Sequence, residues 1–318
     1  MHSLIELVLF FSKLVMILLF FTALIAILLA FSGKKKDKTK GCVIVKNLNK
    51  QYDEMKEAIL SETLTKKEFK AYLKNKKEKD KKNEKTDKIK KTIFVLQCQG
   101  DIKASFITEL SEVISAILNI AKKDDEVLLR LESPGGIVHA YGLAASQLMR
   151  LRDKNIPLTV SIDKVAASGG YLMACIANKI LSAPFAMVGS IGVLMQLPNF
   201  HRWLENKKID FVQLTSGEYK RNLSLFGENT KQGEEKAKEE LEMIHQLFKK
   251  VIQTYRPMVD IQKVATGEVW PGERALDFHL VDAIKTSDDY LLEHVESARL
   301  FQIDYEMKQS FLKKWLNF

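Results

Sequence analysis

The sequence of 318 residues contains only three cysteines, and none of them is placed for shared chemistry. No CxxC pair occurs, and no histidine lies near Cys42, Cys98 or Cys175. A zinc site needs clustered thiolate and imidazole ligands, and a disulfide framework needs paired thiols at suitable spacing. A chain of this length can also bury a large hydrophobic core without disulfides or a structural metal. We therefore expect buried or incidental thiols, with no disulfide, metal or other cofactor.

The sequence also lacks the signatures of nucleotide binding and of nucleic-acid binding. No GxxxxGK[ST] phosphate-binding loop occurs, and residues 34–91 contain 21 lysines but no arginine. Against 10 acidic residues the lysines give this segment a net charge of +11, whereas the whole chain carries +9. Nucleic-acid sites typically combine arginine with stacking aromatics. We therefore expect no nucleic-acid partner and interpret 34–91 as a solvated, lysine-rich, partly helical tether, which could lie near anionic lipid head groups.

Charge is also missing from one long apolar run. Residues 14–31 read LVMILLFFTALIAILLAF, which is 18 residues without a charged side chain. That length is sufficient for a membrane-spanning helix. The preceding residues lack the basic cluster of a cleaved signal peptide, so the sequence predicts an uncleaved N-terminal membrane anchor over residues 1–33. A second apolar run, residues 180–195, is interrupted by one proline and two glycines, and we interpret it as buried core.

Beyond residue 91 the composition changes to alternating apolar strands and amphipathic helices, which is typical of an α/β domain. The predicted strands are 92–97, 126–131, 157–162, 180–183 and 211–215. The predicted helices are 106–121, 138–151, 169–177, 200–206 and 234–255. We expect a catalytic domain over residues 92–290 and a C-terminal extension over residues 291–318.

A lone hydroxyl among very small residues marks the candidate nucleophile. Ser168 stands in the run VAASGGY, residues 165–171, and an apolar helical stretch follows it. A substrate carbonyl must approach a serine oxygen to about 3 Å, which bulky neighbours would prevent. The backbone N–H of Gly169 could then face the resulting oxyanion. The alternative interpretation is a tight turn packed against another backbone.

A second turn of small residues, SPGG at 133–136, follows the predicted strand 126–131. Its glycines permit backbone conformations that expose N–H groups, so Gly135 or Gly136 could join Gly169 in an oxyanion hole. The same glycines could cradle a phosphate or only turn the chain. The motif by itself does not separate these alternatives.

The base that would accept the serine proton is harder to find. None of the six histidines lies in a small-residue turn as a triad histidine might, although His139 follows the SPGG turn closely. A lysine can serve instead if burial lowers its pKa by about 3 from a reference value near 10.4. Lys220 follows a predicted strand and lies between Tyr219 and Leu223, although a lysine after a turn is usually solvated.

Four ordered motifs together carry a family resemblance. They are LRLESPGG at 129–136, DKVAASGGYLMA at 163–174, VGSIGV at 188–193 and EYKRNLSLFGENT at 218–230. With the apolar segment and the lysine-rich tether ahead of them, these motifs resemble the signal peptide peptidase A family of membrane serine proteases, and its short branch most closely. The resemblance implies a ClpP/crotonase-type α/β fold of stacked β-β-α units.

The resemblance also implies a Ser/Lys dyad in place of a triad. Ser168 is then the nucleophile, Lys220 the general base and Ser190 the residue that positions the lysine amine. The implied oxyanion donors are Gly169 and the pair Gly135 and Gly136. A neutral amine would deprotonate the serine, and after acyl-enzyme formation it would activate water.

One departure from the family pattern is His279, which stands where a glycine often precedes Leu-Val-Asp. We expect a local left-handed adjustment there, because histidine enters that region more readily than branched residues do.

The implied function is a membrane-anchored endopeptidase that cuts peptides or unfolded segments without ATP or metal. The resemblance also implies a homo-oligomer, with the dyad formed within one chain or between chains. It places the catalytic domain on the periplasmic face of the cell inner membrane, whereas the lysines after the anchor favour a cytoplasmic C-terminal side. Two alternatives are acyl-CoA chemistry on the same fold and a catalytically silent membrane scaffold.

Overall fold

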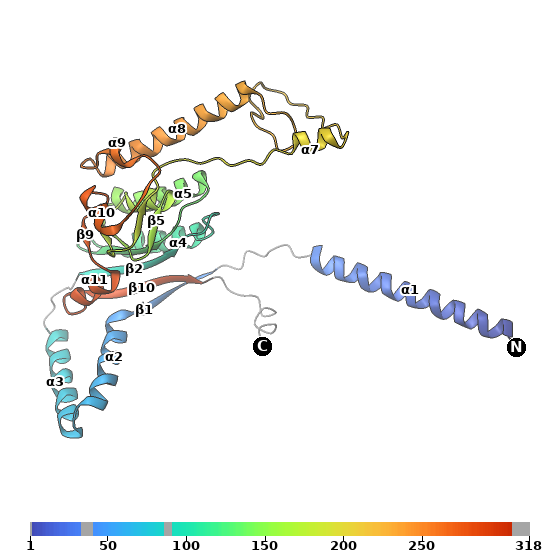
Figure 1. Ribbon diagram of the computed structural model, residues 1–318. Helices are drawn as coiled ribbons and strands as arrows, with labels where there is room; N and C mark the ends of the chain where they lie inside the picture. The colour runs from blue at the N-terminus through green and yellow to red at the C-terminus, as the bar shows by residue number, and fades with distance from the viewer. Residues whose placement is uncertain (1, 33–40, 86–90, 307–318) are drawn as a thin grey trace. The chain divides into compact units, whose positions relative to one another are not determined.

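The computed structural model describes residues 2–32, 41–85 and 91–306 (Figure 1). Residues 43–305 form one compact unit, and helix α1, His2–Ser32, belongs to another. The described side chains of α1, residues 9–25, are all exposed. Within the described residues, no helix is both long enough and apolar enough to cross a membrane. Outside the described residues lie the ends of the predicted anchor, residues 1 and 33, parts of the predicted tether, 34–40 and 86–90, and positions 307–318 of the predicted extension.

The 43–305 unit is built on a seven-stranded sheet with the order β1-β10-β2-β3-β4-β6-β9. The neighbouring pairs from β10 to β9 are all parallel. Parallel sheets are covered on both faces, which is why nearly every residue of β3 and β4 is buried. The strands are β1 Cys42–Asn47, β2 Thr92–Gln99, β3 Glu126–Glu132, β4 Leu158–Ile162, β6 Lys179–Ser182, β9 Ala283–Ile284 and β10 Arg299–Glu306.

Alternating side chains of β2 contribute to two core clusters, because successive residues of a strand point to opposite faces. Phe94 and Leu96 belong to the larger cluster, which includes buried residues of α4, Ile107–Ile120, and α5, Val138–Asp153. Ile93 and Val95 belong to the smaller cluster, with buried residues of α2 and α11. Figure 1 shows α4 and α5 over one face of the sheet and α11 at the other. Helix α2 spans Leu48–Thr63, and helix α11 spans Ser287–His294.

A second sheet of three short strands has the order β5-β7-β8. Strand β5, Val165–Ala167, runs parallel to β7, Met187–Gly189, and β7 pairs antiparallel with β8, Val269–Pro271. Helix α6, Gly169–Ala174, begins one residue after β5. The chain thus leaves the large sheet after β4 and again after β6, and it enters the small sheet each time.

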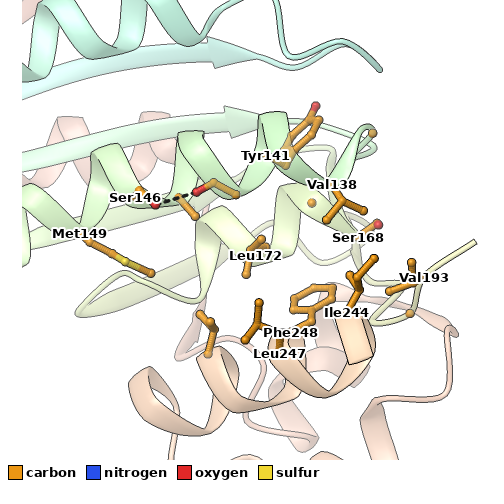
Figure 2. A pocket seen from close by; sticks show the side chains of 16 residues that line it. Val138, Tyr141, Ser146, Met149, Ser168, Leu172, Val193, Ile244, Leu247 and Phe248 are labelled. Atoms are coloured by element: carbon orange, nitrogen blue, oxygen red, sulfur yellow. Dashed lines mark hydrogen bonds between the residues drawn. The ribbon is translucent and has the colours of Figure 1, made fainter. Parts of the chain in front are cut away.

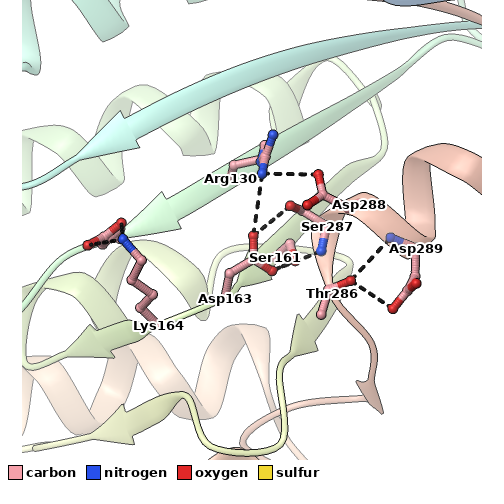
Figure 3. Close-up of polar contacts among 9 residues, drawn as sticks. Arg130, Ser161, Asp163, Lys164, Thr286, Ser287, Asp288 and Asp289 are labelled. Atoms are coloured by element: carbon pink, nitrogen blue, oxygen red, sulfur yellow. Dashed lines mark hydrogen bonds and ion pairs between the residues drawn. The ribbon is translucent and has the colours of Figure 1, made fainter. Parts of the chain in front are cut away.

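The turn between β4 and β5 is fixed by Asp163, whose carboxylate joins it to the start of α11 (Figure 3). This carboxylate accepts hydrogen bonds from the Ser287 N–H at 2.8 Å and the Ser287 hydroxyl at 2.5 Å. Arg130 lies 3.9 Å from Asp163 and pairs with Asp288 at 3.2 Å. A carboxylate at a helix N-terminus is stabilised by the unpaired N–H groups there. Asp163 therefore holds the start of β5, the strand that leads to Ser168, in place.

The remaining helices differ in how much of them is buried against this core. The segment between β7 and α8 is the least buried part of the unit, because residues 194–200 and 205–221 are exposed throughout. In α8 the apolar stripe predicted from the sequence is present, with Phe248 and Ile252 buried. These helices are α3 Lys66–Lys85, α7 His201–Asn206, α8 Lys231–Tyr255, α9 Ile261–Val264 and α10 Gly272–Asp277.

Most predicted strands and helices are confirmed, with ends shifted by a few residues. Two expectations are wrong. Residues 211–215 form no strand, and Leu214 there is 91% exposed. The apolar run 180–195 is only partly buried, because Phe185 within it is 90% exposed and Leu194 and Met195 at its end are also exposed. Strands β1 and β10, which fall in the predicted tether and extension, are both part of the large sheet.

Candidate active site

Ser168 stands at the sharp turn between β5 and α6. Its backbone angles are φ 52° and ψ −120°, a region that residues with a side chain rarely occupy. Its N–H donates to Gly189 O at 2.8 Å, which holds the turn against β7. The partly exposed hydroxyl caps nothing in α6 and has no hydrogen-bond partner in the described part of the chain. A strained turn that presents a free hydroxyl suits a nucleophile.

The SPGG turn lies directly against the turn of the candidate nucleophile. Ser133 N–H donates to Val165 O at 2.8 Å, and Ala167 N–H donates to Ser133 O at 3.0 Å, so the chain after β3 runs beside β5. A Cβ added to Gly135 would lie 2.7 Å from Gly169 N. Gly135 also has a φ of +86°, which glycine adopts without strain. The two small-residue motifs of the sequence therefore meet in space.

Two backbone N–H groups at this junction, those of Gly136 and Gly169, have no hydrogen-bond acceptor among the described residues. The Gly135 N–H, in contrast, donates to Ser133 Oγ at 3.1 Å. Of the predicted glycine pair, only Gly136 therefore has an N–H available for a substrate. Gly136 is held in place closely, because a Cβ there would lie 2.2 Å from Ile102 O. Two unpaired N–H groups beside a free hydroxyl form the basis of an oxyanion hole.

Ser190 follows β7 and lies next to the nucleophile turn. The register pairs Ala167 with Gly189, so Ser168 and Ser190 are the next positions along the two neighbouring strands. Ser190 also has a positive φ, 51°, and its N–H donates to Glu268 O at 2.6 Å. The structure therefore places Ser190 beside Ser168.

Lys220 is not brought to Ser168 within this chain. It is exposed in the segment between α7 and α8, where its backbone N–H donates to Gly217 O at 3.2 Å. It lines a cavity of about 640 Å³ formed only by residues between 197 and 226, whereas Ser168 lines a different cavity. The structure thus joins Ser168, Ser190 and the glycines and leaves the predicted base apart.

Among the described residues, no histidine takes the place of the lysine. The described residues that line the cavity beside Ser168 include no histidine, lysine or carboxylate. His139 is exposed on α5 and does not line this cavity. His201, His245 and His294 lie in helices α7, α8 and α11, as their sequence surroundings predicted.

An apolar cavity of about 330 Å³ opens beside Ser168 (Figure 2). Helices α5 and α6 form one wall, with Met149 and Leu172, and α8 forms the facing wall, with Ile244 and Phe248. Cavities of this kind receive the apolar part of a ligand next to a few polar groups. The cavity could therefore hold an apolar side chain of a substrate whose carbonyl lies at Ser168.

Comparisons with known proteins identify the family. Residues 2–148 match the N-terminal part of peptidase family S49, and residues 150–300 match peptidase family S49 itself. A probable protease SohB of Buchnera aphidicola subsp. Schizaphis graminum is 45% identical over 326 residues, which cover 100% of this chain and 94% of that relative. The chain belongs to peptidase family S49. The resemblance predicted from the four motifs is confirmed, and the family assigns the chain to the serine-type peptidases.

Two other SohB relatives agree with this assignment. The probable protease SohB of Haemophilus influenzae is 55% identical over 229 residues, which are 72% of this chain and 65% of that relative. The putative protease SohB of Buchnera aphidicola subsp. Baizongia pistaciae is 42% identical over 329 residues, covering 98% of this chain and 93% of that relative. The solved structure of the 1510-N membrane-bound stomatin-specific protease matches with a TM-score of 0.44 and 14% identity, over 72% of this chain and 97% of that one.

Tyr141 and Ser133 also support the site, and neither role was predicted from the sequence motifs. Tyr141 is fully buried in α5, and a Cβ at Gly169 would lie 2.4 Å from its ring. Burial raises the pKa of Tyr141, and its hydrogen bond with Ser133 opposes this rise. The one signal in the sequence is a large aromatic residue among small ones, in the run HAYGLAAS. A ring in such surroundings must pack against a neighbour without a side chain.

Proposed function

We propose that the chain is a membrane-anchored serine endopeptidase that cleaves peptides or unfolded protein segments through an acyl-enzyme. The observation that carries this proposal is the junction at Ser168, where a free hydroxyl, two unpaired N–H groups and an apolar cavity meet. Attack by Ser168 Oγ on a substrate carbonyl would direct the developing oxyanion toward the N–H groups of Gly136 and Gly169. The apolar cavity favours substrates with an apolar side chain beside the cleaved bond.

Lys220 is the proposed general base, and Ser190 is proposed to position its amine. Because Lys220 and Ser168 line different cavities of one chain, we propose that the dyad forms between two chains of a homo-oligomer. The segment around Lys220 has the apolar surface that such an interface needs, since Val212 and Leu214 are 77% and 91% exposed. Burial of this segment against a second chain would also favour the neutral amine.

The proposed ClpP/crotonase-type arrangement is supported by the order of the strands. Strand β4 of the large sheet is followed by β5 of the small sheet and then by α6, and β6 is followed by β7 in the same way. Proposed boundaries are 92–290 for the catalytic domain, 34–91 for the tether and 291–318 for the extension, with β1 and β10 both added to the catalytic sheet at the edge next to β2.

The proposed membrane anchor is residues 1–33. Its support is the 18-residue apolar run 14–31, together with the exposure of apolar side chains in α1, such as Phe10 and Leu18. We propose that the chain resides in the cell inner membrane, with its catalytic domain on the periplasmic face.

Cleavage by the detergent-solubilised full chain tests the function. The substrates are an unfolded protein and a fluorogenic peptide with an apolar residue before the cleaved bond. Ser168→Ala and Lys220→Ala should each lower kcat by at least about 10³-fold. Lys238→Ala, which removes another exposed lysine, on α8, should leave kcat unchanged. A folded wild type that cuts nothing would instead favour the silent scaffold or acyl-CoA chemistry.

Mixing the two inactive variants tests whether the dyad is shared. If each site takes Ser168 from one chain and Lys220 from another, random co-assembly restores about a quarter of the wild-type activity, since each chain has an even chance of being the required one. A mixture that stays inactive, although the chains are shown to co-assemble, would place the dyad within one chain.

A further inference from the structure

Tyr141 contacts both halves of the proposed oxyanion hole. The face of its ring supports the Gly169 backbone, where no side chain could be accommodated. Its hydroxyl extends the other way, toward the SPGG turn, and Figure 2 shows it directed away from α8. Tyr141 and Ser133 are both fully buried. One side chain thus reaches from the nucleophile turn to the turn that carries the second N–H donor.

The directions of the hydrogen bonds in this network follow from the chemistry of the groups. The Tyr141 hydroxyl donates to Asp101 O at 2.8 Å, because a carbonyl oxygen can only accept. A phenol has one proton, so the 2.7 Å contact between the two hydroxyls is donated by Ser133. Ser133 Oγ in turn accepts the Gly135 N–H at 3.1 Å. The result is one directed chain of three hydrogen bonds, from Gly135 through Ser133 and Tyr141 to Asp101.

This chain of hydrogen bonds determines which glycine N–H can serve the substrate. The Gly135 N–H is turned inward and occupied, so the next N–H, that of Gly136, is left at the junction with Gly169. Glycine backbones have many accessible conformations, and a pair of them keeps one conformation only when its surroundings impose it. Buried hydrogen bonds that polarise one another can hold the two glycines in one conformation.

We propose that Tyr141 is a positioning residue for the oxyanion hole, acting through Ser133 to fix the SPGG turn so that the Gly136 N–H faces the substrate carbonyl. This inference rests on the proposed peptidase function. The hydroxyl touches no substrate, because it is buried behind the turn. Since burial raises the pKa of Tyr141, the phenol remains a proton donor at neutral pH.

The test is Tyr141→Phe in the detergent-solubilised full chain. The variant keeps the ring against Gly169 and the wall of the cavity, and it removes only the hydroxyl. We expect kcat to fall about 10- to 100-fold with KM unchanged, because oxyanion contacts strengthen in the transition state. Inhibition by a peptide aldehyde, whose serine adduct carries the oxyanion, should weaken by a similar factor. The pH dependence of kcat should keep its shape, because the base is not altered.

Ser133→Ala is the second variant, since it removes the acceptor for the Gly135 N–H without touching the tyrosine. It should reproduce the loss in kcat, and the double variant should be no worse than either single one, because all three break the same chain. Additive losses, or a Ser133→Ala variant with wild-type kcat, would overturn the inference.

Tyr171→Phe is the matched control. Tyr171 is also a fully buried tyrosine that donates to a backbone carbonyl, that of Leu280 at 3.0 Å, but it has no hydrogen bond to the SPGG turn. We expect a similar loss of thermal stability with kcat within twofold of wild type. The inference fails if Tyr141→Phe keeps its kcat, or if Tyr171→Phe loses as much. Failure of the peptidase function itself differs, because the wild type would then neither turn over substrate nor bind the aldehyde.

Discussion

Arg256 binds Asp282 through both terminal nitrogens of its guanidinium, at 2.6 and 2.9 Å. The same carboxylate accepts the Ile180 N–H at 2.7 Å, and Arg256 also donates to His279 O at 2.9 Å. The pair thus joins the end of α8 to β6 and to the turn after α10. Since α8 forms one wall of the cavity beside Ser168, this ion pair fixes the wall.

Removing one partner of this ion pair should destabilise the folded protein. Arg256 is 3% exposed, so Arg256→Met removes a buried cation and leaves the Asp282 carboxylate, whose side chain is 29% exposed, without its partner. We expect the free energy of unfolding to fall by about 3 kcal/mol, measured by urea denaturation. The double variant Arg256→Met/Asp282→Leu should recover most of this loss. A single variant as stable as wild type would show that the pair does not hold α8.

Stability should fall in acid partly through Glu126. Burial raises the pKa of this carboxyl, but hydrogen bonds from Lys91, Tyr290 and Thr159 outweigh burial and leave the pKa below its usual 4.5. A lowered pKa in the folded state adds stability that is complete above about pH 4.5 and is lost as the pH falls through the folded-state value. Glu126→Gln should therefore cost about 2 kcal/mol at pH 7 and less at pH 3.

The measurement for Glu126 is the difference in unfolding free energy between wild type and variant as a function of pH. Other carboxyls with lowered pKa values, such as that of Asp101, remain in both proteins and cancel in this difference. A difference that stays constant from pH 7 to pH 3 would contradict the prediction.

Gly142 offers a way to change substrate choice. It lines the cavity beside Ser168 from within α5, and a Cβ there would meet nothing within 4 Å. Gly142→Leu should fill the cavity and add up to about 1 kcal/mol of stability through better helix propensity. We expect kcat/KM for peptides with phenylalanine before the cleaved bond to fall at least about 10-fold, while peptides with alanine there are cut as before. Equal losses for both peptides would show that the cavity does not bind this side chain.

The three cysteines should differ in reactivity. Burial raises the pKa of both Cys98 and Cys175 to about 12, whereas Cys42 is exposed. Only a thiolate reacts readily with an alkylating reagent. Iodoacetamide should therefore label one thiol of the folded chain at pH 7.5 and three after denaturation, as counted by mass spectrometry. Rapid labelling of a second thiol in the folded state would contradict the burial of Cys98 or Cys175.

The parts of the fold that could be predicted from the sequence are those set by local pattern. Strands such as β3 are short segments rich in apolar residues, and α8 repeats its apolar residues at helical spacing. The two glycine-rich turns could be recognised because only small residues allow backbones to approach so closely. His279 also has the expected left-handed conformation, with a φ of 58°.

The features that the sequence does not predict have a common physical cause, which is that they depend on partners far away in the sequence. Residues 211–215 carry a strand pattern, but a strand requires a neighbour to pair with, and the sequence does not say whether one is present. The occupied Gly135 N–H depends on a serine hydroxyl whose direction is set by Tyr141 and Asp101. The separation of Lys220 from Ser168 depends on how a long exposed segment is placed, and no local pattern encodes that.

The backbone conformation at Ser168 implies a conflict between thermal stability and catalysis. A φ of 52° costs a serine about 1–3 kcal/mol, and glycine would largely avoid that cost. A library of variants screened only for thermal stability should therefore be enriched in Ser168→Gly. The selected variants would be more stable than the wild type but catalytically inactive. Directed evolution of a robust form of this peptidase must select for turnover in every round, because thermal selection alone leads away from the enzyme.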